Sequence, residues 1–128
     1  MHRPSTISLR RSLYEEADAI VQTEFERDLA LDEIARRVAS SRRQLQRAFA
    51  EVGRTTFRDR LTNVRMDRAA EMLARPDLTV REVARRVGYR QPAQFAKAFR
   101  RRHAVSPSTY RDRARVIHGP AEHLSHAA

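Results

Sequence analysis

One helical pattern occurs twice in this chain, and the duplication constrains the fold more than any other feature. Glu33–Val38 reads EIARRV, and Glu82–Val87 reads EVARRV at an offset of 49 residues (33 to 82). Three apolar positions follow at an offset of 50 residues (45 to 95): Leu45, Ala48 and Phe49 in the first copy, and Phe95, Ala98 and Phe99 in the second. One extra residue therefore lies in the turn of the second copy. Two short helices around a tight turn, present twice, predict a duplicated helix–turn–helix.

The positive charge of the chain is concentrated where the two copies lie. The net charge is +10 and the isoelectric point is about 11.4. Residues 1–33 hold four arginines against eight acidic residues, a net charge of −4, which leaves +14 on residues 34–128. Such a surplus predicts a polyanionic partner, and together with the duplicated motif it indicates double-stranded DNA. We expect the acidic N-terminal part to lie away from the phosphates.

Capping residues and apolar spacing predict an all-α fold of about seven helices. Ser12 with Glu15 forms a capping-box pattern that predicts the start of the first helix, after a frayed polar arm over residues 1–11. Thr56 is expected to cap a longer helix that ends before Pro76. The expected organisation is an N-terminal helix and first helix–turn–helix over 12–55, a linker helix over 56–75, a second helix–turn–helix over 78–116 and a disordered tail over 117–128.

The second copy has the more complete set of local signals. Ser41, with Gln44 three residues on, opens the second helix of the first copy. In the second copy, Thr79 with Glu82 caps the first helix, and Gly88 supplies the turn, where a positive φ costs little. Pro92 fits the first turn of the following helix because its missing N–H has no partner there.

The composition argues against several classes of function. The chain has no cysteine, which excludes disulfides, cysteine-based zinc sites and thiol nucleophiles. It shows no signal segment or long apolar run, so we expect a cytoplasmic, nucleoid-associated protein without membrane contact. We find no glycine-rich phosphate loop and no nucleophile with a paired base, so neither enzyme activity nor a cofactor is expected. His118, His123 and His126 lack a carboxylate or cysteine at ligand spacing, so no metal site is predicted.

Together with the repeats and the long joining helix, a closing motif gives the chain a family resemblance. The second copy contains Glu82-Val83-Ala84 and Val87-Gly88-Tyr89, then Phe95 and Phe99, and closes with Pro107-x-x-Tyr110-Arg111. With this pattern the chain resembles the AraC/XylS family of bacterial transcription regulators over roughly residues 13–113. The resemblance implies two helix–turn–helix subdomains joined by a long linker helix, whose recognition helices enter successive major grooves about one helical turn apart.

The resemblance also implies partners. In layout the chain is similar to the short stand-alone activators of the family, which implies a monomer on a promoter site and contact with RNA polymerase. A DNA-binding domain of a longer, effector-responsive regulator is the alternative. Two rivals from other classes are a sequence-tolerant architectural DNA-binding protein and a helical module that binds other proteins.

Matched by position to the family, the residues that read bases fall on both second helices. In the first copy of the motif they are Arg43, Gln46 and Arg47, and in the second copy they are Pro92, Ala93, Gln94 and Lys97. Arginine pairs with guanine and glutamine with adenine in the major groove, so Arg43, Gln46, Arg47, Gln94 and Lys97 are the predicted base-reading set. Ala39-Ser40 stands where the family usually has a glycine and an aromatic residue. Because Pro92 and Ala93 replace common polar residues, the first helix is expected to contribute more base-specific contacts.

A larger set of arginines is expected to contact the DNA backbone or to form ion pairs. These residues are Arg36, Arg37, Arg42, Arg85, Arg86, Arg90, Arg100, Arg101, Arg102 and Arg111. The aromatic residues, by contrast, have the spacing of core positions and are predicted to pack inside rather than to stack on bases: Phe49, Phe57, Tyr89, Phe95, Phe99 and Tyr110.

Overall fold

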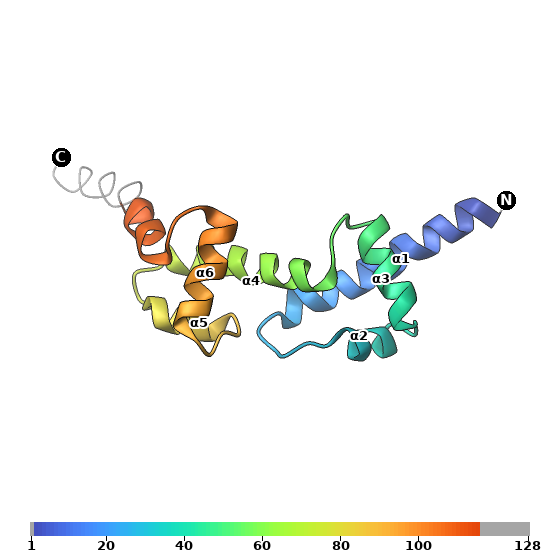
Figure 1. The fold of residues 1–128 in the computed structure, drawn as a ribbon, viewed down its shortest axis with the longest axis horizontal. Coiled ribbons are helices and arrows are strands. Elements are labelled where there is room, and N and C mark those ends of the chain that lie inside the picture. The colour runs from blue at the N-terminus through green and yellow to red at the C-terminus, as the bar shows by residue number, and fades with distance from the viewer. Residues whose placement is uncertain (1, 116–128) are drawn as a thin grey trace. The chain divides into compact units, whose positions relative to one another are not determined.

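The computed structural model describes residues 2–115, and the backbone there forms seven helical segments and no strand (Figure 1). The all-α fold is confirmed. The segments are α1 (His2–Glu24), α2 (Leu31–Arg37), α3 (Arg42–Glu51), α4 (Phe57–Leu73), α5 (Val80–Arg86), α6 (Pro92–His103) and a last helix over 107–115. The chain divides between Val64 and Arg65 into two compact units. Each unit contains one helix–turn–helix, α2–α3 in the first and α5–α6 in the second.

The first helix starts earlier than predicted. α1 begins at His2, so the expected frayed arm is wrong, and Ser12 lies inside the helix rather than at its cap. The physical reason is that residues 6–9 of α1 are exposed and bury no apolar side chain. Ile7 is 58% exposed and Leu9 is 70% exposed, and they are the exposed large hydrophobic residues among those described. Without buried positions at helical spacing, the sequence gives no periodic signal for these turns.

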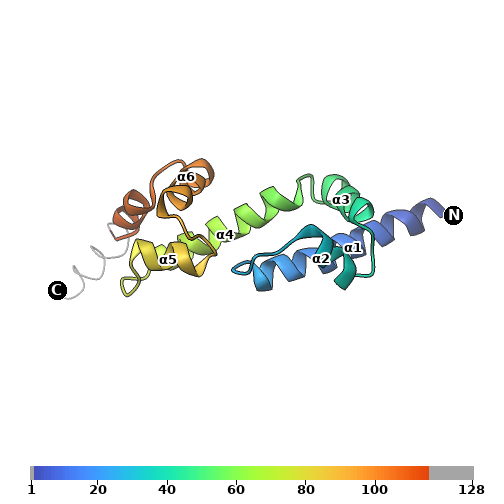
Figure 2. The ribbon, with the colours of Figure 1, turned by 60° about the horizontal axis from the view of Figure 1, so that its bottom comes forward.

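The core of the first unit forms where α1, α2 and α3 meet (Figure 2). Its fully buried side chains come from all three helices and include Val21, Ile34, Leu45 and Phe49. The ring of Phe49 packs edge-on against Tyr14 of α1, with ring centroids 5.3 Å apart. α3 is thus held from behind by its apolar face, and its opposite face is left to solvent.

Both helix–turn–helix turns use the same hydrogen bonds. In the first, the N–H of Ala39 donates to Arg36 O at 3.1 Å and the N–H of Ser40 donates to Ala35 O at 2.8 Å. The second repeats this pattern at Gly88 and Tyr89. This is the Schellman arrangement, which requires a left-handed residue just after the helix. It is Ala39 with φ 55° in the first copy, and Gly88 with φ 97° in the second, as predicted for Gly88.

The predicted capping residues at the starts of α3, α4 and α5 are confirmed. The Ser41 hydroxyl accepts a hydrogen bond from the N–H of Gln44 at 3.1 Å. Thr56 Oγ1 accepts one from the N–H of Asp59 at 3.1 Å, which starts α4. Thr79 and Glu82 form the complete reciprocal capping box of α5. These local bonds satisfy backbone donors at the helix starts, which fixes where each helix begins.

α4 contributes core residues to both units. Leu61 and Val64 are buried in the first unit, where Arg60 Nε also donates to Asp18 Oδ1 at 2.6 Å. Met66 and Ala69 are fully buried in the second unit. The chain therefore passes between the units within one uninterrupted helix of 17 residues.

The second unit closes around Phe99, which is fully buried. Tyr110, from the last helix, packs edge-on against this ring with the centroids 5.4 Å apart, and His103 lies 4.5 Å from it. Arg111 donates through Nε to Leu73 O at 3.1 Å and through Nη2 to the carbonyl oxygens of Arg75 and Leu78. Its guanidinium thereby binds one carbonyl group at the end of α4, which has no helical partner, and two in the segment that follows.

Candidate nucleic-acid interface

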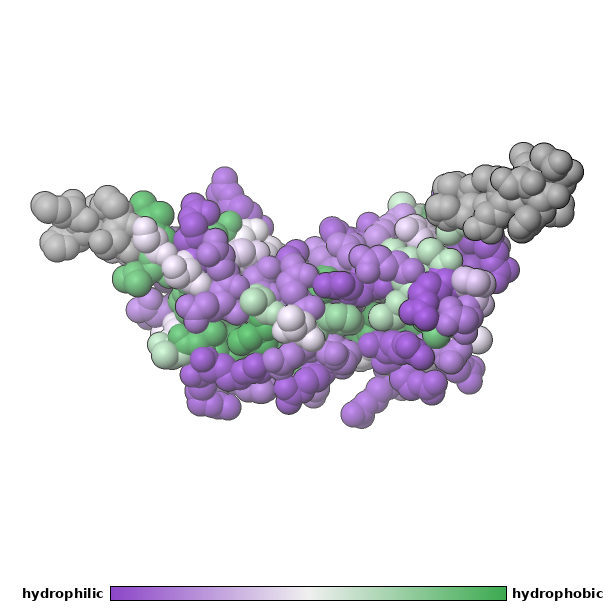
Figure 3. Space-filling model, turned by 180° about the vertical axis from the view of Figure 1, so that it is seen from behind, coloured by the Kyte–Doolittle hydropathy of each residue, from purple (hydrophilic) through white to green (hydrophobic). Residues whose placement is uncertain are grey.

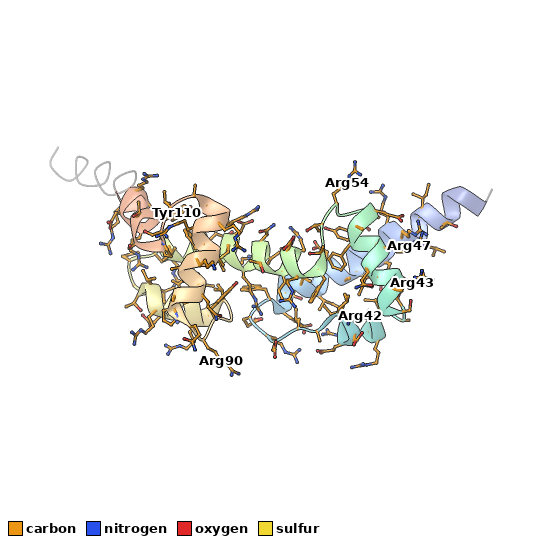
Figure 4. The ribbon with its side chains drawn as sticks, viewed as in Figure 1. Arg42, Arg43, Arg47, Arg54, Arg90 and Tyr110 are labelled. Atoms are coloured by element: carbon orange, nitrogen blue, oxygen red, sulfur yellow. The ribbon has the colours of Figure 1, made fainter. Side chains whose placement is uncertain are left out.

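The exposed face of α3 carries three predicted base-reading residues. Gln46 and Arg47 follow Arg43 by three and four residues, so the three side chains share one face of the helix. All three are exposed. The opposite face is anchored by Leu45 and Phe49, which are buried. Figure 4 shows the side chains of Arg43 and Arg47 along α3. A row of long polar side chains on a helix with a packed rear face fits the width and depth of a major groove.

Two arginines of α3 already have carboxylate neighbours. Arg42 Nη1 lies 3.1 Å from Asp32 Oδ1 of α2. Arg47 Nε lies 3.7 Å from Glu51 Oε2, one turn along α3. The other oxygen of Glu51 accepts a hydrogen bond from Arg10 Nη1 of α1 at 2.5 Å. Arg43 and Gln46, by contrast, have no hydrogen bond or ion pair with other side chains of the described part of the chain.

The exposed face of α6 carries the second reading set. Gln94 and Lys97 are exposed and three residues apart, and Arg101 follows four residues later on the same face. Phe95 and Phe99 anchor the opposite face in the core. Pro92 and Ala93 are also exposed at the start of this helix but offer no side-chain hydrogen bond. α3 and α6 thus present exposed side chains of different chemistry, and each helix is anchored by buried apolar residues on its opposite face.

Six of the arginines predicted to contact the DNA backbone are exposed and have no hydrogen-bonded carboxylate in the described residues. They are Arg36, Arg85, Arg86, Arg90, Arg100 and Arg101. Arg36 closes α2, Arg85 and Arg86 close α5, and Arg100 and Arg101 lie in the last turn of α6. Hydrophilic residues cover much of the surface seen in Figure 3.

Three others are committed to contacts within the protein. Arg37 donates to both oxygens of Glu24, at 2.9 and 2.6 Å. These hydrogen bonds, with a smaller contribution from Arg27, lower the pKa of the Glu24 carboxyl to about 2. Arg102 binds both oxygens of Asp67 at 3.0 and 2.9 Å. Arg111 is directed to backbone carbonyls. The sequence pattern does not separate these three arginines from the six above, because it gives the helix face but not the acceptor that a distant segment supplies.

One further exposed cation, which the sequence pattern did not single out, lies in the loop that follows α3. Arg54 is exposed in the loop between α3 and α4 and has a left-handed backbone with φ 56° (Figure 4). Residues other than glycine are uncommon in the left-handed region of backbone conformation. The position of Arg54 directly after Gly53, in the loop that ends a candidate reading helix, is the sequence signal for this residue.

The aromatic residues lie where their spacing predicts. Phe49, Phe95 and Phe99 are buried, while Phe57, Tyr89 and Tyr110 are partly buried and pack edge-on against them. These six residues pack against one another in the cores of the two units and do not form an open surface on which bases could stack.

Two other expectations concern metal and membrane. Within the described residues no group of three or more metal-ligating side chains comes together. The predicted tail over 117–128, with His118, His123 and His126, lies outside the described residues. No helix in the described part of the chain is both long and apolar enough to span a bilayer.

Comparison with known proteins places these features in a wider group. The helix-turn-helix domain family matches residues 34–113. The DNA-binding domain of the global transcriptional factor AdpA, solved in complex with a target DNA, is 28% identical with a TM-score of 0.77, covering 83% of this chain and 96% of that one. The C-terminal domain of AraT, a response regulator from Geobacillus stearothermophilus, is 35% identical with a TM-score of 0.72, covering 78% and 84%.

A curated relative with a named role shows the same similarity. The RCS-specific HTH-type transcriptional activator RclR of Escherichia coli (strain K12) is 38% identical over 77 residues, which cover 60% of this chain and 27% of that protein. Other curated relatives are matched over between 13% and 40% of their own length. The similarity therefore concerns the helix–turn–helix portion of these regulators.

Proposed function

Because the chain belongs to the AraC-type helix-turn-helix family of DNA-binding transcription regulators, we propose that it binds one specific double-stranded DNA site through α3 and α6 and regulates transcription from it. In this proposal each helix enters a major groove of the same site. The two reading sets differ in chemistry, so the preferred site is not a palindrome and one copy of the chain occupies it. Its place in the cell is then on the nucleoid.

The observation that carries the proposal is the opposed faces of the two candidate reading helices. On α3 the exposed set Arg43, Gln46 and Arg47 stands directly opposite buried Leu45 and Phe49. A packed rear face fixes the helix, so the face from which the exposed side chains project is set before DNA arrives. Preorganisation of this kind favours specific recognition over a general attraction to phosphate.

The chemistry of the two sets predicts a division of labour. Arg47 and Arg43 can each donate two hydrogen bonds to one guanine, and Gln46 can donate to and accept from one adenine. Such pairs contribute about 1–3 kcal/mol of discrimination each. α6 offers Gln94 and Lys97 and two residues without polar side chains. We therefore expect the sharper base preferences in the half of the site that α3 contacts.

The direction of regulation follows by analogy with a relative. RclR is by its name an activator, and the matched part of that protein is the part that this chain contains. We propose that this chain also activates, by contact with RNA polymerase beside a promoter. Transcription in a purified system, with and without the protein, on a promoter that carries the selected site, tests this. Reduced transcript would indicate a repressor.

Selection of bound duplexes from a random library tests sequence-specific binding directly. A single enriched site is expected, and Arg47→Ala should relax the preference at one or two base pairs of that site. Arg90→Ala is the matched control, because Arg90 is an exposed arginine outside both reading faces and should weaken binding about equally on all sequences. A uniform loss with Arg47→Ala would instead make Arg47 a phosphate contact.

An architectural, sequence-tolerant binder is the rival that the arginine surface keeps open. The two are separated by the ratio of affinities for the selected site and for random DNA. A ratio below about 10³ would favour the architectural role. No shift of duplex DNA at any concentration would favour a module that binds other proteins.

A further inference from the structure

We propose that Glu51, anchored by Arg10 of α1, positions the guanidinium of Arg47 for base recognition. The inference rests on the proposed function, in which Arg47 reads a base pair in the major groove. It assigns a role in specificity to two residues outside the predicted base-reading set, Glu51 at the end of α3 and Arg10 in α1.

The geometry divides the two oxygens of one carboxylate between two arginines. Glu51 lies four residues after Arg47, in the last turn of α3. Its Oε2 lies 3.7 Å from Arg47 Nε, and its Oε1 accepts a hydrogen bond from Arg10 Nη1. Arg10 and Glu51 are separated by 41 residues in sequence, so this contact ties α1 to the end of α3.

The contact at Nε leaves the outer edge of the Arg47 guanidinium available. An arginine reads guanine with two parallel N–H donors, and the pair of terminal nitrogens supplies them. In the described residues no hydrogen bond engages Nη1 or Nη2 of Arg47, whose side chain is 57% exposed. The separation of 3.7 Å is an ion-pair distance rather than a hydrogen bond, so Glu51 orients the group without holding it back.

Arg10 controls how strongly Glu51 attracts Arg47. Its side chain is the most buried of the three, 27% exposed against 45% for Glu51, and it neutralises the carboxylate from the α1 side. Without Arg10, both oxygens of Glu51 would be free to bind Arg47 in the bidentate manner that carboxylates favour. The terminal nitrogens of Arg47 would then face Glu51 rather than the groove.

The experiment measures base preference rather than affinity alone. The base pair read by Arg47 is first assigned as the position where Arg47→Ala abolishes preference in the selected site. Dissociation constants are then measured for duplexes with each of the four base pairs there, using Glu51→Gln, Arg10→Gln and the double variant. We expect each single variant to lower the preference at that pair about three- to tenfold, a fraction of a full arginine–guanine contact. The double variant should lose no more than Glu51→Gln.

Two backgrounds make the result specific. In the Arg47→Ala background, Arg10→Gln should not change the base preference at all. Asp32→Asn is the matched control, because Asp32 pairs with Arg42 at the start of α3 at 3.1 Å and should leave the preference at the Arg47 pair unchanged. Arg10→Lys keeps the charge and should retain most of the preference. Thermal melting of each variant checks that the fold is intact.

The outcomes separate the inference from the proposed function. An equal change of affinity on all four duplexes with Arg10→Gln, or no change, overturns the positioning role, because Arg10 would then act as a general charge or not at all. A double variant with the summed loss of both singles does so too. If the random library yields no enriched site, the proposed function itself fails before these variants are measured.

Discussion

Ala39 and Gly88 occupy the same position in the two helix–turn–helix turns, each directly after the C-cap residue of the preceding helix, and both have a positive φ. The angle is 55° at Ala39 and 97° at Gly88. The flanking hydrogen bonds are also equivalent, from Ala39 to Arg36 O at 3.1 Å and from Gly88 to Arg85 O at 3.0 Å. The first copy therefore makes the same turn with a residue that disfavours it, since the left-handed conformation costs roughly 1–2 kcal/mol for an L-residue with a side chain.

Replacing Ala39 by glycine should stabilise the protein. Relief of the left-handed strain is partly offset by the greater freedom of glycine in the unfolded chain, which leaves a gain of about 0.5–1 kcal/mol. Urea unfolding measures it as a higher midpoint at an unchanged slope. Gly88→Ala is the matched reverse change and should destabilise. The same sign for both variants would contradict this account.

Arg111 should be more important for stability than for DNA binding. Its guanidinium reaches three backbone carbonyls, of Leu73, Arg75 and Leu78. Arg111→Ala removes these charge-assisted bonds and should lower the free energy of unfolding by about 1–3 kcal/mol. Arg111→Lys keeps the charge but not the fork of donors, so it should restore little of the loss. The measurement is denaturant unfolding.

Arg113, an exposed arginine two residues further along the same helix, supplies the control for Arg111. Arg113→Ala should change the free energy of unfolding by less than about 0.5 kcal/mol. If Arg111→Ala leaves the unfolding midpoint unchanged and lowers DNA affinity on all sequences, Arg111 is a phosphate contact, the role expected for the set of arginines to which it belongs.

Acid should remove the contribution of Glu24. The hydrogen bonds from Arg37, with a smaller contribution from Arg27, lower the pKa of Glu24 from 4.5 to about 2. Because the folded pKa is depressed, the stabilisation is complete above about pH 4.5 and is lost as the pH falls through 2. The unfolding midpoint of Glu24→Gln should thus lie below that of the unmodified protein at pH 7, and the two should converge near pH 2. Glu15→Gln, at an exposed residue of α1, is the control.

DNA affinity should depend steeply on salt. If six to ten phosphates are neutralised, affinity should fall by about 10³–10⁵ between 50 and 200 mM salt. Dissociation constants across this range give the slope. Arg90→Ala should make the slope shallower by about one, the effect of one lost phosphate contact. A nearly salt-independent affinity would show that few arginines reach the phosphates.

Most of the fold could be predicted from the sequence because its signals are local. The caps at Ser41, Thr56 and Thr79 and the turn at Gly88 each depend on residues within three positions, so their geometry follows from the chain itself. Buried positions such as Leu45 and Phe99 follow from helical spacing. The start of α1 at His2 could not be predicted, since residues 6–9 are exposed and bury no apolar side chain that would give a periodic pattern.

The candidate site was predictable as faces but not as contacts. Spacing places Gln46 and Arg47 on the exposed side of α3, and the structure shows both exposed. It cannot tell that Arg37 is bound by Glu24 while Arg36, the preceding residue, is not, because that depends on a carboxylate from another helix. The partnership of Arg10 with Glu51 is hidden for the same reason.

The continuity of α4 has a consequence for how the protein unfolds. Val64 is buried in the first unit and Met66 in the second, on the same helix and two residues apart. Unwinding of α4 that begins in one unit therefore reaches, within two residues, a side chain that is buried in the core of the other unit. Unfolding is therefore expected to be cooperative across the chain. A destabilised variant would unfold α3 and α6 together, and no species that binds DNA through one of the two helices alone would accumulate.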